Sequence, residues 1–124
     1  MDAGHVGRRL FQAAGVICLA TIAVLSVLPG ADRPHVFGSG NVEHLIAYAG
    51  AAFFASSLPG LRGWRIVLVL SVASLTFEGL QMFIPGRSPG LDNWLASTLG
   101  ALIGLAFARA FATVARTTVS IASR

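Results

Sequence analysis

An acidic side chain inside an apolar segment is the feature of this sequence with the most chemical content. Glu78 and Gln81 lie three residues apart in a run that begins at Ile66, and Pro85-Gly86-Arg87 closes that run. A charge without a partner in the hydrocarbon of a membrane costs about 2.5–3.5 kcal/mol, so an acid retained there points to a function. The pair therefore predicts a binding or catalytic site with Glu78 as its acid.

Polar residues also recur on one face of the neighbouring segments. Asn41, His44 and Tyr48 are spaced i, i+3 and i+7, which is one side of a helix. Glu43 is expected at the interface, in contact with water, and is not a candidate. If consecutive helices are antiparallel, the polar groups of three helices meet at one end, and Glu78 and His44 become candidates for acid–base catalysis. The ligand-binding candidates are Asn41, His44, Tyr48, Glu78, Gln81, Arg87, Asp92, Asn93 and Ser97.

The same side chains have structural alternatives. Polar groups between membrane helices stabilise packing by about 0.6–2 kcal/mol, so Glu78 and His44 can serve as interhelical hydrogen-bonding groups. Asp92 and Asn93 are good N-cap residues for the helix that they open. Arg87 can turn back toward Glu78 or Asp92, or it can contact a headgroup phosphate.

The composition is that of a membrane protein. Of 124 residues, 55% are hydrophobic and 11% charged, with a mean hydropathy of +0.75, whereas soluble domains carry about 25% charged residues. Four apolar runs approach the roughly 20 residues that cross a bilayer, and lipid requires them to be helical. They cover approximately residues 10–28, 42–58, 66–84 and 91–112. The sequence predicts an all-α membrane protein, a four-transmembrane-helix antiparallel bundle forming one domain over residues 1–124.

Other classes of protein are excluded by the same composition. The basic excess consists of nine arginines at the ends of apolar runs, where they act as topology signals, so no nucleic acid is expected as a partner. The single Cys18 forms neither an internal disulfide nor a metal site, and no metal or cofactor is expected. Arg8-Arg9 before an apolar run is also typical of a signal peptide. That run exceeds the usual length of about 7–15 residues, and Pro29 lies where cleavage needs a small residue, so an uncleaved helix is expected.

The arginines predict an orientation. Seven of the nine fall on one side of four alternating helices, and only Arg33 and Arg87 fall on the other. Because cytoplasmic loops are enriched in positive charge, both termini are expected in the cytoplasm and the loops 29–41 and 85–90 outside. The seven are Arg8, Arg9, Arg62, Arg65, Arg109, Arg116 and Arg124.

Small residues form a stripe along the fourth run. Ala96, Gly100, Gly104 and Ala108 recur every four residues and include a Gly-x-x-x-Gly pair. Small side chains at this spacing let two helix backbones approach closely. We expect the stripe to pack within the bundle, with homodimerisation as the alternative.

Taken together, these motifs resemble the VanZ-like family of small membrane proteins. The resemblance extends over roughly residues 24–108. It rests on Asn-x-x-His-x-x-x-Tyr at 41–48, Glu-x-x-Gln at 78–81, Gly-Arg-Ser at 86–88 and a fourth-helix segment at 94–104 that ends in Gly-x-x-x-Gly. The combined order and spacing carry the resemblance, since each piece alone is common.

Two positions depart from the family pattern. Alignment through Gly100 puts Asn93 where the family usually has Asp, with Asp92 one place early. Ser97 occupies the usual Asn or Asp of the fourth helix. Whether Asp92 or Asn93 fills the family's position is open, and a mechanism with two carboxylates is correspondingly weakened.

The resemblance implies a multi-pass protein of the bacterial cytoplasmic (inner) membrane, acting at the cell envelope. The family's namesake is associated with resistance to the glycopeptide teicoplanin. The favoured hypothesis is a non-enzymatic protein whose outward-facing polar pocket binds lipid headgroups or peptidoglycan precursors, with the bilayer as its surroundings. The alternatives are an intramembrane acid–base enzyme and a proton-coupled exporter, because small multidrug-resistance transporters also have four helices and one membrane Glu.

Overall fold

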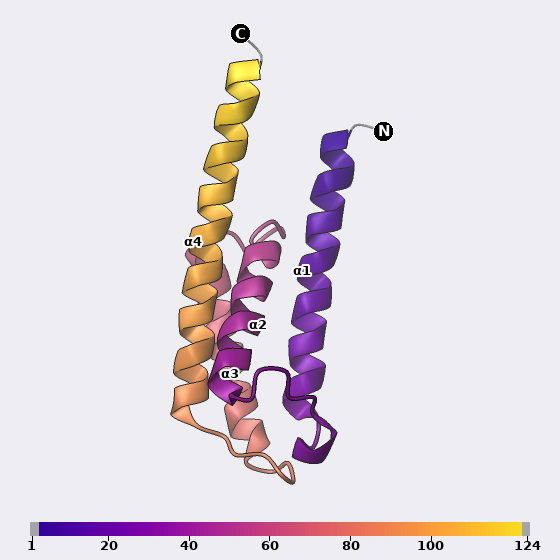
Figure 1. Ribbon diagram of the computed structural model, residues 1–124, viewed down its shortest axis with the longest axis vertical. Helices are drawn as coiled ribbons and strands as arrows, with labels where there is room; N and C mark the ends of the chain where they lie inside the picture. The colour runs from indigo at the N-terminus through magenta and orange to yellow at the C-terminus, as the bar shows by residue number, and fades with distance from the viewer. Residues whose placement is uncertain (1–2, 123–124) are drawn as a thin grey trace.

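The structure is a computed structural model that describes residues 3–122. Within this range all the regular elements are helical (Figure 1). Four α-helices and one 3₁₀ helix occur there. They are α1 Ala3–Val27, η1 Gly30–Asp32, α2 Gly40–Ala55, α3 Trp64–Gln81 and α4 Leu91–Ala122. The predicted all-α fold with four helices is confirmed.

The helix ends differ from the predicted ones. α1 begins at Ala3 instead of residue 10, and α4 continues to Ala122 instead of residue 112. Charged and threonine residues continue a helix at moderate cost, and no Gly or Pro follows Gly104, so nothing stops α4 where its apolar run ends. The ends of the apolar runs therefore predicted neither the start of α1 nor the end of α4 correctly.

α2 and α3 end earlier than predicted. Each was expected to reach the residue before a Pro-Gly pair, at positions 58 and 84, but the final residues form turns instead. Leu58 N donates to Ala55 O at 2.9 Å, and Ile84 N donates to Gln81 O at 3.2 Å. A residue that precedes proline is disfavoured in the α region, which explains why neither helix continues.

The earlier end of α3 changes the position of Glu78. From the predicted end at Ile84, Glu78 would lie about 9 Å below the end of its helix. α3 ends at Gln81, so Glu78 lies only three residues, about 4.5 Å, from the last helical residue. The acid is therefore in the final turn of α3, within reach of the connection to α4.

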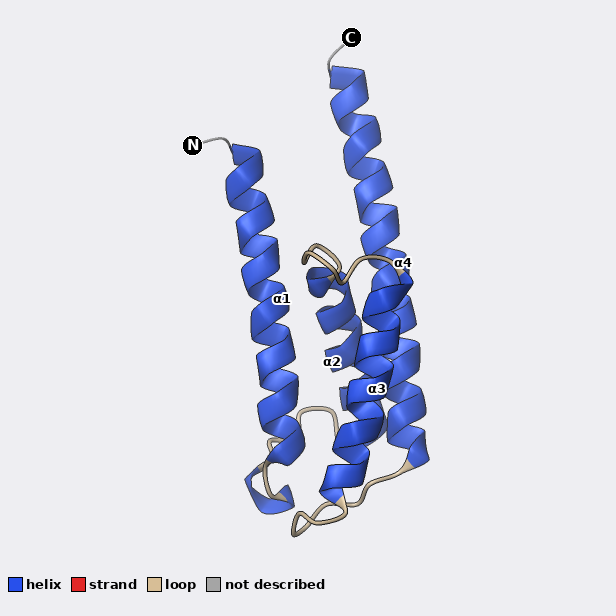
Figure 2. Ribbon diagram, turned by 180° about the vertical axis from the view of Figure 1, so that it is seen from behind, coloured by secondary structure: helices blue, strands red, loops and turns tan. Residues whose placement is uncertain are grey.

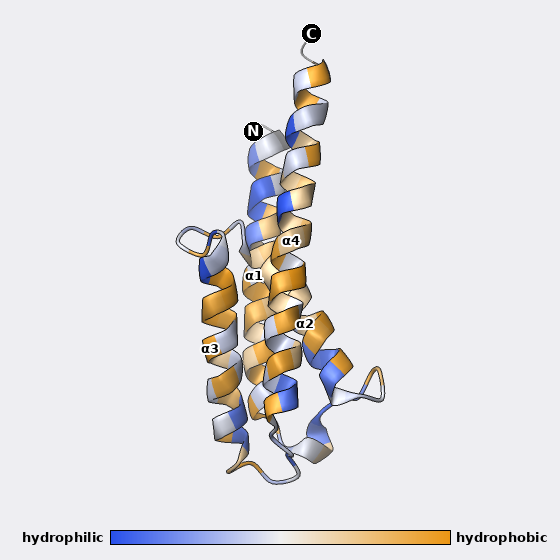
Figure 3. Ribbon diagram, turned by 90° about the vertical axis from the view of Figure 1, so that its left-hand side faces the viewer, coloured by the Kyte–Doolittle hydropathy of each residue, from blue (hydrophilic) through white to orange (hydrophobic). Residues whose placement is uncertain are grey.

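Three described helices are long and apolar enough to cross a membrane: Gly4–Val27 of α1, α3 and α4. α2 has 16 residues, which rise about 24 Å against roughly 30 Å of hydrocarbon. By length alone, the expected crossing by the second helix is therefore not established. Hydrophobic residues predominate along the middle of the helices, and hydrophilic ones gather toward the helix ends (Figure 3). Exposed large side chains include Leu10, Ile17, Leu68, Val72, Leu99 and Phe107.

α2 lies at the centre of the bundle, with α1 on one side and α4 on the other (Figures 1 and 2). Methyl groups built on Gly100 and Gly104 would overlap the carbonyl oxygens of Leu45 and Ala49, so α4 lies directly on the backbone of α2. Gly15 of α1 makes a similar close approach to the backbone of Ala55. Small residues thus allow the backbones of α1 and α4 to lie close to the backbone of α2.

The two ends of the bundle have different connections. The Arg62 end comprises the 56–63 connection and the ends of α1 and α4 that lead to the chain termini (Figure 1). The Arg87 end comprises segments 28–39 and 82–90. Gly30 N donates to Pro85 O at 3.1 Å, which joins these two segments, and a side chain on Gly30 would overlap Gly86.

Replacing Gly104 by Ala tests the α2–α4 contact. Its methyl group would overlap the Ala49 backbone, which we expect to destabilise the fold by about 2 kcal/mol. The matched control is Gly50→Ala, because a methyl group on this helical glycine meets nothing within 4 Å. Thermal unfolding followed by circular dichroism in detergent should show a lower midpoint for Gly104→Ala alone. Equal midpoints for the two variants would contradict the close approach.

Candidate functional site

Glu78 links the end of α3 to the start of α4 by hydrogen bonds. Its side chain is 6% exposed, and Oε2 accepts hydrogen bonds from Gly90 N at 2.7 Å and from Asn93 Nδ2 at 3.5 Å. Gly90 precedes α4, where the first backbone N–H groups of a helix lack partners within it. A carboxylate is also favoured at this positive end of the helix dipole. Part of the role of Glu78 is therefore to hold two helices together.

Beyond this link, Glu78 Oε1 is buried in the same region with no hydrogen-bond partner within the described chain. The Tyr48 side chain is 2% exposed, and its hydroxyl lies near those of Ser74 and Ser97 and near the Glu78 carboxylate, without a well-aligned hydrogen bond to any of them. An unsatisfied buried polar group costs about 1–3 kcal/mol. The cluster can therefore take up a proton or a polar atom from a ligand.

His44 lies between this buried cluster and the apolar cavity beside α2, and it contacts Ser97. Its Nδ1 lies 3.0 Å from Ser97 Oγ, and the Ser97 hydroxyl donates to Asn93 O at 2.8 Å. When the single Ser97 hydrogen is donated to Asn93 O, His44 Nδ1 is the donor to Ser97, and the neutral ring has its lone pair on Nε2. The ring lies nearly parallel to that of Tyr48, at a centroid distance of 6.1 Å.

Arg87 and Gln81 cap the end of α1. Arg87 Nη2 donates to the carbonyl oxygens of Leu25 and Ser26 at 3.2 and 3.1 Å, and Gln81 Nε2 donates to Ser26 O at 3.0 Å. Terminal carbonyls of a helix lack intrahelical partners and favour a cation. Arg87 forms no ion pair with the acids toward which it was expected to turn, Glu78 and Asp92, among the residues that the structure describes.

Asp92 and Asn93 point to different partners. Asp92 is exposed, and its Oδ2 accepts a hydrogen bond from Asn41 Nδ2 at 3.0 Å, which links the first turns of α2 and α4. Asn93 is half-buried and donates inward to Glu78. The carboxylate of this pair thus faces the surface, and the amide faces the buried acid.

Sequence reasoning left Arg33 and Glu43 out of the site. Arg33 Nη2 lies 2.9 Å from Glu43 Oε2, with side chains that are 17% and 10% exposed. Glu43 Oε1 accepts from Val36 N and Phe37 N at 2.7 and 3.3 Å, so one carboxylate organises the loop before α2. Glu43 was expected at the interface and was not a candidate, and its contacts give it a structural role at this end. Nothing in the sequence signalled the pair, because ten residues separate the two charges and Asp32 adjoins Arg33.

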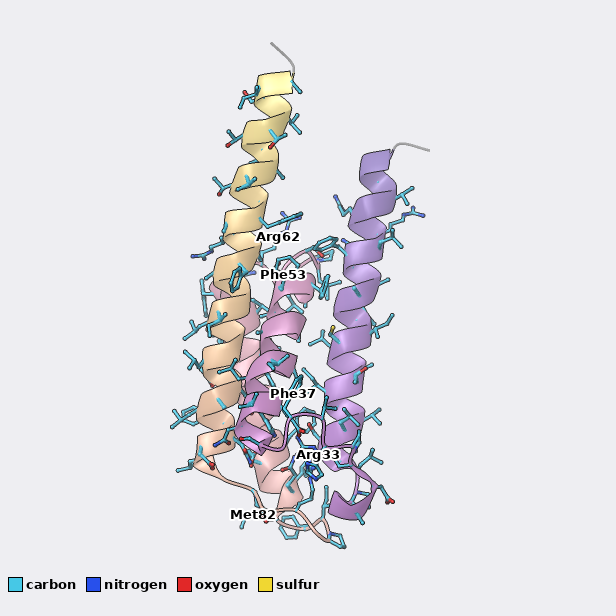
Figure 4. All side chains as sticks on the ribbon, in the orientation of Figure 1. Arg33, Phe37, Phe53, Arg62 and Met82 are labelled. Carbon is cyan, nitrogen blue, oxygen red and sulfur yellow. The ribbon has the colours of Figure 1, made fainter. Side chains whose placement is uncertain are left out.

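Two cavities meet at this end. The first, of about 220 Å³, is mainly apolar and lies between α1, α2 and the 33–37 loop; the second, of about 320 Å³, is mainly polar and lies between the loops. Arg33 and Arg87 line both cavities, and Figure 4 shows Arg33 at this end. Residues lining the first include Leu25, Phe37, His44, Ala47 and Tyr48. Residues lining the second include Asn41, Gln81, Asp92 and Asn93.

The nine predicted ligand-binding residues therefore lie at one end but not in one pocket. Asn41, Gln81, Asp92 and Asn93 line the polar cavity. His44 and Tyr48 line the apolar cavity, and Arg87 lines both. Glu78 and Ser97 line neither of the two and lie in the buried cluster beside them. In the small-residue stripe, Gly100 and Gly104 are buried against α2, and Ala96 and Ala108 are half-buried.

A sequence model of the VanZ/LLP1 family matches residues 8–112, which is most of the chain. The matched range contains all four helices, apart from the first turn of α1 and the last ten residues of α4, and every candidate residue described above. Searches of curated proteins and of solved structures give no significant match.

Two substitutions at Glu78 separate hydrogen bonding from charge. Gln keeps a carbonyl acceptor for Gly90 N and brings an amide donor toward the nearby hydroxyls, whereas Leu leaves Gly90 N unsatisfied. We expect Glu78→Gln to accumulate in the membrane with an unfolding midpoint near that of the parent. Glu78→Leu should unfold several degrees lower, because a buried orphan N–H costs about 1–3 kcal/mol. Thermal unfolding in detergent measures both variants, and equal destabilisation would show that the charge itself holds the helices.

Proposed function

The chain belongs to the VanZ/LLP1 family, and on that premise we propose that it is a multi-pass protein of the bacterial cytoplasmic membrane that binds an anionic lipid of the cell envelope. The ligand lies at the Arg87 end, with its apolar chain in the apolar cavity and its headgroup in the polar cavity. The observation that carries the proposal is that Arg33 and Arg87 line both cavities.

The two arginines retain hydrogen-bonding capacity for a phosphate. Each guanidinium has five N–H donors. Arg33 uses one nitrogen to reach Glu43, and Arg87 uses Nη2 for the end of α1 while its Nε is buried without a partner. Guanidinium groups bind phosphate through charge-assisted, often bidentate hydrogen bonds. A lipid phosphate at the boundary of the two cavities would complete this set.

The shape of the site favours a lipid over a free anion. Ile46 and Ala47 of α2 and Val36 of the preceding loop line the apolar cavity and are also exposed, so an acyl chain can enter from the bilayer. The polar cavity lies between the loops, where a headgroup can stay hydrated. A small anion would use the arginines and leave the apolar cavity unused.

The proposal includes an orientation. α2 serves as a fourth, short crossing between α1 and α3, both termini are cytoplasmic, and the Arg87 end faces outward. A ligand there belongs to the outer leaflet, where lipid-linked envelope precursors are consumed. Through such a ligand, the protein would influence glycopeptide resistance, as the resemblance to the family's namesake suggests.

Acid–base catalysis on the bound lipid is the second candidate. The observation in its favour is the buried cluster, in which Glu78 Oε1 lacks a hydrogen-bond partner among the described residues and lies near the Tyr48 hydroxyl and His44. A buried carboxyl and a histidine with a free lone pair are suited to moving a proton. Lipid binding is preferred to catalysis because the cavities have room for a headgroup and an acyl chain, whereas nothing in the described chain positions a reacting bond beside Glu78 or His44.

Photo-crosslinking tests the lipid site. Purified full-length protein is irradiated with phosphatidic acid that carries a diazirine in one acyl chain, or with the matching diacylglycerol, which lacks phosphate. We expect adducts on peptides 21–26 and 33–48, with phosphatidic acid about tenfold more efficient because of its charge-assisted hydrogen bonds. Adducts are located by peptide mass spectrometry.

Filling the apolar cavity provides the matched comparison. Ala47→Phe places a ring in the cavity and should reduce adducts there, whereas Ala106→Phe puts the same ring on an exposed face of α4 and should leave them unchanged. Equal labelling by diacylglycerol, or equal labelling of both variants, would contradict the proposed function.

A further inference from the structure

A third cavity lies at the Arg62 end, far from the residues of the proposed lipid site. There α1 and α4 extend past the α2–α3 connection, and no Cα atom of α1 comes within 8 Å of one in α4 among the described residues (Figures 1 and 2). The cavity has a volume of about 800 Å³ and is lined by both helices and by the connection. Its size and its walls allow a ligand larger than an ion.

Aromatic rings form the floor of this cavity. Phe11 of α1 stacks on Phe111 of α4 with ring centroids 5.9 Å apart, and Phe53 of α2 packs against both at 5.7 and 6.0 Å. Gly4 and Gly7 line the α1 side, and a methyl group on either would meet nothing within 4 Å. The cavity therefore has an apolar floor, and there is free space beside the two glycines of α1.

Arginines from three segments surround the floor. They are Arg8 of α1, Arg62 of the connection, and Arg109 and Arg116 of α4. Within the described part of the chain, none of these four guanidinium groups makes a hydrogen bond or an ion pair. Figure 4 shows Arg62 and Phe53 at this end of α2. The acidic residues that the structure describes belong to the opposite end: Asp32, Glu43, Glu78 and Asp92.

The arginines lie at the height expected for lipid headgroups. Arg109 follows Leu91, the start of α4, by 18 residues, which rise about 27 Å and nearly match the roughly 30 Å of hydrocarbon. Arg8 precedes Val27, the end of α1, by 19 residues, or about 28 Å. Phe11 and Phe111 lie within three residues of Arg8 and Arg109, so the aromatic floor and these two guanidinium groups lie together at the boundary between hydrocarbon and headgroups.

We propose that this cavity binds an anionic phospholipid of the leaflet on the side of the chain termini. The phosphate lies among the four guanidinium groups, whose planar donors pair with phosphate oxygens, and an acyl chain follows the phenylalanine rings. Four unpaired cations around an apolar floor attract an anion from the adjoining bilayer. This site uses the leaflet opposite to that of the proposed function and does not depend on it.

Native mass spectrometry of the purified full-length protein tests this site. The protein receives equal amounts of phosphatidylglycerol and phosphatidylcholine with identical acyl chains. The double variant Arg109→Gln with Arg116→Gln removes two cavity arginines. Its control, Arg9→Gln with Arg65→Gln, removes two arginines that do not line the cavity. Parent and control should prefer phosphatidylglycerol, and the cavity variant should bind it about tenfold more weakly.

A second variant tests the cavity without changing charge. Gly7→Phe fills the open wall beside the floor, and it should also lose phosphatidylglycerol while its helicity by circular dichroism stays at the parent level. Three results would overturn the proposal: equal binding of the two lipids by the parent, an equal loss in the Arg9 and Arg65 control, or undiminished binding by Gly7→Phe. A protein dimer that dissociates in the cavity variant would also overturn it, because a second copy would then occupy the cavity.

Discussion

The ends of helices leave backbone N–H and C=O groups without partners in the helix, and where such groups are buried the rest of the chain must supply the partners. At the Arg87 end, this constraint accounts for most of the polar side chains. Arg87 and Gln81 satisfy the last carbonyls of α1, and Glu78 satisfies the amide before α4. Glu43 satisfies two amides of the loop before α2. The rest of the arrangement depends on these links, since they hold four helix ends and two loops together.

The same network leaves hydrogen-bonding capacity unused, and the proposed binding site depends on that capacity. Structural hydrogen bonds use only part of what Arg33 and Arg87 can donate, and both guanidinium groups lie between an apolar and a polar cavity. Glu78 likewise uses one oxygen for α4, and its other oxygen is buried with no hydrogen-bond partner among the described residues. The side chains that hold the helix ends are thus the ones available to a ligand. A structural and a binding role are compatible for each of them.

Charge is divided between the two ends of the described chain. Its acids belong to the Arg87 end, where each of Glu43, Glu78 and Asp92 accepts hydrogen bonds. At the Arg62 end, the four arginines that line the cavity have no such partners among the described residues and surround an aromatic floor. A bilayer has phosphate at both surfaces, so each end can meet anionic lipid in a different way. One end would hold a headgroup between loops, and the other would hold it between diverging helices.

The sequence could predict the elements better than their partners. Apolar runs with closing Pro-Gly pairs predicted four helices, and the i, i+3, i+7 spacing of Asn41, His44 and Tyr48 put polar groups at one end. Hydropathy could not locate the end of α4, because helix propensity continues after the apolar run stops. It could not identify the partners of Arg87 either, because backbone carbonyls leave no signal in the sequence. The Arg33–Glu43 pair depended on a loop whose path only the fold defines.

The outward position of the Arg87 end is tested most directly by cysteine labelling in intact cells. Cys18 is replaced by Ala, and single cysteines are placed at Ser88, in the 82–90 segment, or at Thr117, on the exposed end of α4. A membrane-impermeant thiol reagent should label position 88 in intact cells and position 117 only after the membrane is opened. Labelling of position 117 in intact cells, with or without position 88, would contradict a lipid site that faces the outer leaflet.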